Sequence, residues 1–188
     1  INDTRYKEGI YVGYRYFDTV GKKPLFPFGY GLSYTSFDIA VTGAAAEGDT
    51  IRIKAAVSNT GARAGREVVQ VYVRDPKSTL QKPEKELKAF TKVALAPGES
   101  KTVTLELMPK DFASYDTALQ KWTIEPGTYE ILVGDSSRTI MADAKISVTG
   151  KNPYGYSLRS SCGFIAANPE AMAACSEVLG EAFDVDAF

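Results

Sequence analysis

Carboxylates are the side chains of this chain that could carry out acid–base chemistry. The sequence has no histidine, which excludes Ser-His and Cys-His pairs and imidazole metal sites, and its two cysteines alone cannot complete a structural zinc centre. A general acid or base must reach the proton that it transfers, so geometry decides which carboxylates qualify. The candidates by residue type are Glu8, Asp18, Glu67, Asp75, Glu86, Asp111, Asp116 and Asp135. The strand pattern places no two of them in a shared pocket.

The carboxylates also have structural interpretations. Asp75 and Asp135 end predicted strands, where an acidic residue usually caps a turn. Glu86 falls in the lysine-rich run 82–92, which we expect to be a solvated, mutually paired strand edge and loop. The sequence therefore predicts no catalytic, cofactor-binding or metal-binding residue in this chain, and no cofactor.

The elements that must position these residues are short strands with alternating apolar and polar side chains. In residues 50–58, for example, Ile51, Ile53, Ala55 and Val57 share one face. The pattern predicts strands over 37–42, 50–58, 67–74, 87–93, 102–107, 122–125, 128–133 and 145–149. Turn residues separate them, as at 59–61, 97–99, 126–127 and 134–137. Both faces of 67–74 carry apolar residues, which suits a strand near the middle of a sheet. The fold class expected is a mainly β, antiparallel sandwich of immunoglobulin or fibronectin type III kind.

Aromatic residues crowd the beginning of the chain. Ten of the chain's aromatic residues (11 Tyr, 9 Phe and 1 Trp in all) lie in residues 1–37, where prolines and glycines interrupt them. Such a segment cannot close a core alone, and its aromatic surface would be a large patch if left in water. We expect it to be extended and to pack on a body that this sequence does not contain. Tyr14, Tyr30, Tyr115 and Trp122 could stack on a sugar, but a domain interface explains them without a ligand.

The end of the chain has a different pattern. After a linker-like stretch at 150–155, Asn168 and Pro169 open a predicted short amphipathic helix whose apolar stripe would dock on a neighbouring domain. The expected division is therefore an exit segment of a preceding α/β domain at 1–35, a sandwich at 36–149, and a linker with a helix at 150–188.

Composition limits the partners. A net charge of -1 gives no electrostatic footprint for nucleic acid or for an anionic membrane surface. No apolar run approaches the ~20 residues of a membrane span. We therefore expect neither nucleic acid nor membrane as a partner.

Several motifs in register resemble glycoside hydrolase family 3, the β-glucosidases and their relatives. The runs 6–18 (YKEGIYVGYRYFD) and 24–37 (PLFPFGYGLSYTSF) are similar to the exit from that family's α/β sandwich domain. Residues 59–137 are similar to its fibronectin type III-like domain, with Asn59-Thr60-Gly61, Pro97-Gly98-Glu99 and Val133-Gly134-Asp135 in the family's order. The resemblance covers about residues 6–149, the C-terminal region of such an enzyme.

The resemblance implies a retaining glycosidase whose chemistry lies elsewhere. The family's nucleophile is an aspartate in a Ser-Asp-Trp-like motif of a barrel, and its acid/base is commonly a glutamate of the α/β domain. Neither motif is present, since the one tryptophan, Trp122, follows Lys121. We therefore expect this chain alone to be inactive and to buttress the catalytic barrel and α/β part of the same enzyme, another chain or fragment, which binds most of the β-glycoside substrate.

The resemblance leaves several points open. By frequency in the family, the expected activity is hydrolysis of terminal non-reducing β-D-glucosyl residues. The alternative is a free-standing carbohydrate-binding or adhesion module without catalysis. The sequence also leaves open a homo-oligomer, the compartment, and whether the barrel precedes or follows this region.

Overall fold

The computed structural model describes residues 7–47, 50–117, 121–149 and 173. The chain divides into two units, Ile1–Lys151 and Asn152–Phe188. The linker and the amphipathic helix expected over 150–188 lie outside the described residues, apart from Ala173.

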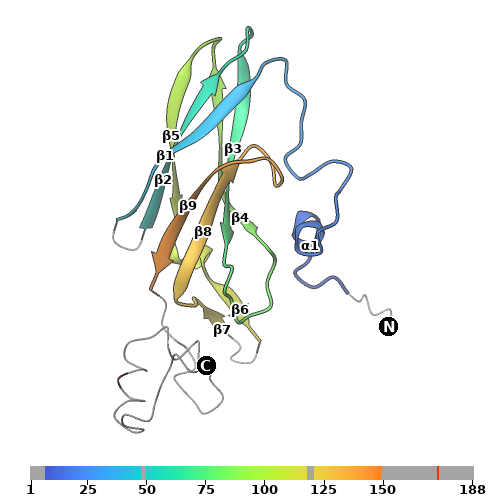
Figure 1. Ribbon diagram of the computed structural model, residues 1–188, viewed down its shortest axis with the longest axis vertical. Helices are drawn as coiled ribbons and strands as arrows, with labels where there is room; N and C mark the ends of the chain where they lie inside the picture. Colours follow the sequence, from blue (N-terminus) through green and yellow to red (C-terminus); the bar gives the residue numbers. More distant parts are fainter. Residues whose placement is uncertain (1–6, 48–49, 118–120, 150–172, 174–188) are drawn as a thin grey trace, which may run out of the picture. The chain divides into compact units, whose positions relative to one another are not determined.

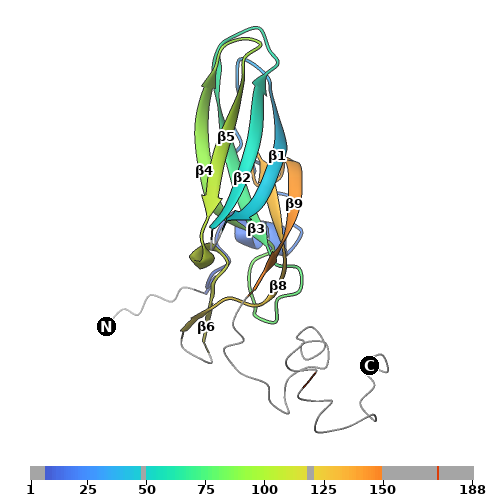
Figure 2. The same ribbon diagram turned by 90° about the vertical axis from the view of Figure 1, so that its left-hand side faces the viewer.

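The described residues form an antiparallel β-sandwich, which confirms the fold class (Figures 1 and 2). One sheet has the strand order β1-β2-β5, and the other has the order β4-β3-β8-β9. A small hairpin, β6-β7, forms a third sheet. The strands are β1 (Phe37–Glu47), β2 (Thr50–Asn59), β3 (Gly65–Arg74), β4 (Glu86–Leu95), β5 (Ser100–Leu107), β6 (Ser114–Asp116), β7 (Lys121–Thr123), β8 (Gly127–Gly134) and β9 (Ile140–Val148).

The core lies between the two larger sheets and follows the predicted alternation. In β2, Ile53, Ala55 and Val57 are fully buried, and in β3 Val69 and Val71 are fully buried. Strand β3 pairs with β4 on one side and β8 on the other, as the apolar residues on both of its faces predicted. The other face of β3 points away from this core. It belongs to the outer face of the four-stranded sheet, where a further segment of the chain can pack.

Three short elements were not predicted. Helix α1 (Tyr14–Thr19) interrupts the segment expected to be extended, and it begins after Gly13 without a side-chain cap. A 3-10 turn, η1, spans Pro109–Asp111, and β6 follows it. Elements of three to six residues are shorter than the windows over which helical or strand periodicity can be recognised.

Two strands exceed their predicted lengths by the most residues. Strand β1 continues past a bulge at Val41–Gly43 to Glu47. Its last residues are glycine, alanine and glutamate, which show no alternation, so pairing with β2 sets the length. Strand β9 begins at Ile140, five residues before the predicted start at 145.

Candidate functional site

Residues 7–36, here called the aromatic segment, lie against the outer face of the four-stranded sheet. Tyr72 is fully buried although it is not part of the core between the sheets. The ring of Tyr14 on α1 meets that of Tyr72 edge-on, with centroids 5.8 Å apart, and packs against Phe28 at 5.2 Å. Burial, with the nearby Tyr14, Asp18 and Asp135, raises the pKa of the Tyr72 hydroxyl well above its usual range. This hydroxyl stays protonated and donates to the side chain of Gln70.

Ion pairs fix helix α1 on the sheet. The Asp18 side chain is only 3% exposed and lies 2.8 Å from Lys85 Nζ and 2.6 Å from Arg138 Nε. Arg138 also donates to the carbonyls of Phe17 at 3.1 Å and Lys22 at 2.7 Å. Because a buried charge without its partner is costly, this network strongly favours one position of the helix.

Backbone contacts add to the attachment. The Leu87 amide donates to the Tyr14 hydroxyl at 2.8 Å, and the Ser137 amide donates to the Phe28 carbonyl at 2.8 Å. Gly29 has φ +90, and a Cβ there would lie 2.3 Å from Gln70 Nε2 and 3.0 Å from the Asp135 carbonyl. Only glycine meets both conditions, which explains the residue between Phe28 and Tyr30.

The segment ends on a buried polar turn. Thr35 Oγ1 donates to Asn59 Oδ1 at 2.7 Å, and Asn59 Nδ2 donates to the Arg63 carbonyl at 2.7 Å. Gly61 and Gly65 both face Thr35 so closely that a Cβ would clash with it. The Asn59-Thr60-Gly61 motif thus contacts the residues that immediately precede β1.

The other side of the aromatic segment is exposed. Leu25, Leu32 and Tyr34 are 88%, 91% and 92% exposed. Phe26, Phe28 and Tyr30 each have half or more of their surface exposed. A hollow of about 710 Å³ also lies beside α1, lined by aromatic and aliphatic side chains together with Lys7, Glu8 and Gln81. Clustered apolar surface of this kind is typical of an interaction site.

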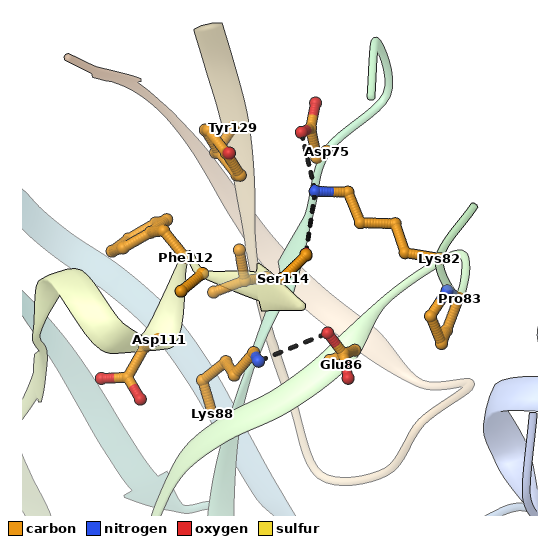
Figure 3. Close-up of a pocket in the computed structure, with 11 residues that line it drawn as sticks. Asp75, Lys82, Pro83, Glu86, Lys88, Asp111, Phe112, Ser114 and Tyr129 are labelled. Atoms are coloured by element: carbon orange, nitrogen blue, oxygen red, sulfur yellow. Dashed lines mark hydrogen bonds and ion pairs between the residues drawn. The ribbon is translucent and has the colours of Figure 1, made fainter. Parts of the chain in front are cut away.

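The structure brings three of the candidate carboxylates, Asp75, Glu86 and Asp111, around a second hollow (Figure 3). Lys82 reaches into it and lies 3.0 Å from Asp75. Its ammonium also lies 5.5 Å from the centroid of the Tyr129 ring. The hollow encloses about 10 Å³, which is room for about one water molecule.

Each of these three carboxylates has a structural partner. Asp75 accepts the Lys77 amide at 3.2 Å, which is the turn-capping role that its position predicted. Glu86 pairs with Arg15 at 3.1 Å and with Lys88 at 3.3 Å, and Asp111 accepts the Met108 amide at 2.7 Å. A hollow of this size, lined by occupied carboxylates, has no space for a sugar ring.

The remaining candidates do not line that hollow. Glu67 lies near Asp135, and Asp18 and Asp135 both lie near Tyr72. Asp18 belongs to the ion pairs of α1, Glu8 is exposed, and Asp116 is buried in β6. Glu67 accepts the Val68 amide at 2.7 Å, and burial raises its pKa. The Asp135 carbonyl accepts a hydrogen bond from Gln70. None of these is described next to a second carboxylate in a shared hollow.

The lysine-rich run differs from its prediction in one respect. Glu86 and Lys88 pair as expected, but Lys82 and Lys85 have side chains only 12% and 11% exposed, so they are not solvated. Their partners Asp75 and Asp18 neutralise them in the buried sites. The sequence pattern did not indicate the Asp18–Lys85 pair because Asp18 lies far from this run in the sequence.

One polar residue was missed altogether. Glu125 accepts hydrogen bonds from Ser78 and Thr79 and lies 3.4 Å from Lys82. Burial raises its pKa, but the hydrogen bonds from Ser78 and Thr79, with the charge of Lys82, outweigh burial and hold the pKa below its ordinary value. A local sequence pattern could not predict this role of Glu125, because its partner Thr79 is 46 residues away in the sequence.

The four aromatics considered for sugar stacking have different surroundings. Tyr14 uses its ring on Tyr72 and Phe28, and Tyr30 pairs with Phe26 at 5.0 Å. Tyr115 and Trp122 form an exposed edge-on pair at 5.7 Å on the β6-β7 hairpin.

Neither a metal site nor a membrane-spanning helix is found in the part of the chain that the structure describes. No three His, Cys, Asp or Glu residues gather there in a way that could hold an ion. The helices of that same part are too short or too polar to cross a bilayer.

Comparison with known proteins defines the class of this sandwich. Residues 67–137 match the fibronectin type III-like domain. The chain is 45% identical over 185 residues to thermostable beta-glucosidase B of Acetivibrio thermocellus, covering 95% of this chain and 24% of that protein. It is 46% identical over 146 residues to an exo-alpha-(1->6)-L-arabinopyranosidase of Bifidobacterium breve, covering 77% of this chain and 19% of that protein.

A solved structure gives the same result. The GH3 beta-glucosidase of Bifidobacterium adolescentis is 39% identical and superposes with a TM-score of 0.80, over 90% of this chain and 25% of that one. The resemblance expected from the motifs is confirmed: this chain belongs to glycoside hydrolase family 3 and contains the fibronectin type III-like domain of that family. It spans about a quarter or less of these relatives, which are larger proteins containing this region as one part.

Proposed function

We propose that this chain is the C-terminal structural portion of a retaining β-glycosidase and buttresses the catalytic domains of that enzyme. The substrate class that fits best is a β-glucoside with a terminal non-reducing glucosyl residue, because relatives at 45% and 39% identity are named beta-glucosidases. The catalytic residues belong to the barrel and α/β part, and the chain supplies none. The similar arabinopyranosidase suggests that this region does not choose the sugar.

The observation that carries the proposal is the two-sided aromatic segment. Its inner side is attached to the sandwich through Asp18, Tyr14 and the Phe28 carbonyl. Its outer side exposes Leu32 and Tyr34 almost completely. A free-standing module gains nothing from holding apolar side chains in water, whereas a domain that abuts a larger body buries them at about 25 cal/mol per Å².

The proposed role is mechanical and electrostatic. The sandwich provides a rigid base, and the ion pairs of Asp18 and Arg15 hold the aromatic segment at one place on it. The α/β part would carry the catalytic acid/base residue. Its position then depends on the sandwich and on the aromatic segment attached to it. Small displacements of a positioning element are costly in catalysis, because reacting groups must be held in a near-attack geometry.

Hydrolysis of an aryl β-D-glucoside tests the proposal. We expect the intact protein that carries this chain to release the aryl group and the 188-residue chain alone to release none. Turnover by the chain alone, or no glycosidase activity of the intact protein on any aryl β-glycoside, would overturn the proposal. The matched control is Asp111→Asn in the intact protein, which keeps an oxygen that can accept the Met108 amide and should leave activity at the same pH nearly unchanged.

A further inference from the structure

Phe90 lies on β4, the edge strand of the four-stranded sheet, and is 70% exposed. In the register with β3, Ala89 pairs with Val71 and Phe90 pairs with Gln70. Ala89 packs against the core, so alternation directs Phe90 to the outer face. On this strand, the small side chain of Ala89 therefore faces the core, and the large ring of Phe90 faces the outer side of the sheet.

Single exposed apolar residues are normal on protein surfaces, so the position of Phe90 matters more than its exposure. Its cross-strand neighbour Gln70 is only 4% exposed, and Gly29 crosses directly over it. Phe28 and Tyr30 flank Gly29 and are 50% and 52% exposed. Gln70 pairs with Phe90 on one side and donates to the Asp135 carbonyl beside Gly29 on the other, so Phe90 and the aromatic segment lie on the same outer face of the sheet.

We propose that Phe90 belongs to the same docking surface as the aromatic segment and contacts the catalytic part of the intact protein. This inference rests on the proposed function above. The occupant is chosen because the relatives devote about three-quarters or more of their length to parts that this chain does not cover. A contact on both the segment and the sandwich fixes their mutual orientation, which a contact on the segment alone would not do.

A large ring at this place has a further consequence. Interfaces draw most of their binding free energy from a few aromatic or arginine side chains that are fully desolvated. Phe90 comes from a strand of the sandwich, so its backbone is held by pairing with β3. The sheet itself therefore sets the position of the Phe90 backbone in such a contact.

Photo-crosslinking in the intact protein tests this inference. p-Benzoylphenylalanine is placed in turn at Phe90, at Tyr30, and at Thr104, an exposed position on β5 of the other sheet. The probe keeps an aromatic ring at positions 90 and 30 and so disturbs them little. Because buried contacts bring side chains within about 4.5 Å, we expect crosslinks from positions 90 and 30 to peptides outside the 188 residues, at yields about tenfold above position 104.

The outcomes separate this inference from the proposed function. Crosslinks from position 30 without any from position 90 would overturn the role of Phe90 and leave the proposed function standing. No crosslink from either position would overturn both. A crosslink from position 90 into residues 1–188 of a second copy, seen as a doubled mass, would overturn the inference in favour of a homo-oligomer.

Discussion

The sandwich core and the outer face of the four-stranded sheet each bind a further layer, but by different chemistry. The core joins two sheets with aliphatic side chains such as Ile53, Val71 and Leu107, all fully buried. The outer face joins the aromatic segment through ion pairs, amide hydrogen bonds and a few rings. Aliphatic burial is non-directional and supplies stability, whereas paired charges and hydrogen bonds have strict geometry and supply position. The core therefore stabilises the sandwich, whereas the polar contacts on the outer face set the position of the aromatic segment.

The largest effect is expected where this orientation depends on a buried charge. Asp18→Ala leaves Lys85 and Arg138 without their shared partner, and removing one member of a buried pair costs about 3 to 5 kcal/mol. We expect hydrogen exchange in α1 to accelerate in the intact protein while β2 and β3 stay protected. The exposed Asp143→Asn is the control. Uniform loss of protection would show that the two layers are not separable.

A core substitution should cost slightly less free energy, but its effect should extend over the whole sandwich and not only over α1. Leu107→Ala removes a fully buried side chain, which typically costs about 2 to 5 kcal/mol in unfolding free energy. Because both sheets share this core, denaturation should report one destabilised transition for the whole sandwich. Loss confined to the aromatic segment would contradict the division between stability and position.

Gly29→Ala tests the closest approach of the segment to the sheet. Alanine at φ +90 is strained, and its Cβ would meet Gln70 Nε2 at 2.3 Å, so we expect a cost of about 1 to 3 kcal/mol. Gly43→Ala on β1, where a Cβ would meet nothing within 4 Å, is the matched control. Equal thermal unfolding midpoints for the two variants would mean that the segment does not cross Gln70.

The pH dependence of stability tests the half-buried Glu125 and its partners Ser78, Thr79 and Lys82. The pKa of Glu125 is lowered in the folded protein, so its contribution is present above its unfolded value and is lost as pH falls through the folded value. Stability of the natural sequence should therefore fall between about pH 5 and about pH 3, and Glu125→Gln should reduce the size of that fall. An identical acid profile for both proteins would show that Glu125 is not held by Ser78, Thr79 and Lys82.

The sequence predicts the sandwich well because its signal is local. The alternation of residues 51–57 and the mixed second face of 67–74 each lie within one strand, and the structure confirms the buried face of the first and the central position of the second. Helix α1 and β6 escape prediction because they have six and three residues, too few to show a period. The burial of Lys82 and Lys85 escapes because its causes, Asp75 and Asp18, are brought near only by the fold.

For the candidate site, residue type indicates an interaction surface, which stays a prediction, but it does not indicate how the aromatic segment attaches to the sandwich. The density of aromatics in 1–37 indicated an interface, and the exposure of Leu32 and Tyr34 agrees with that expectation. The ion pairs under α1 could not be foreseen, since Asp18 and Arg138 are 120 residues apart. Phe90 had no distinguishing signal, because a single phenylalanine in a strand is equally compatible with the core.

The smallest effect on folding, and the most direct test of the docking surface, comes from Leu32 and Tyr34. Because they are 91% and 92% exposed in this chain, replacing both with serine should change its own unfolding free energy by only about 0.5 kcal/mol or less. Hydroxyl-radical footprinting of the intact protein measures what covers them. We expect Leu32 and Tyr34 to be strongly protected relative to their reactivity in the denatured protein, while Met108, 46% exposed on the sandwich, stays reactive. Full reactivity of Leu32 and Tyr34 in the intact, folded protein would contradict the claim that the aromatic segment docks on the catalytic part.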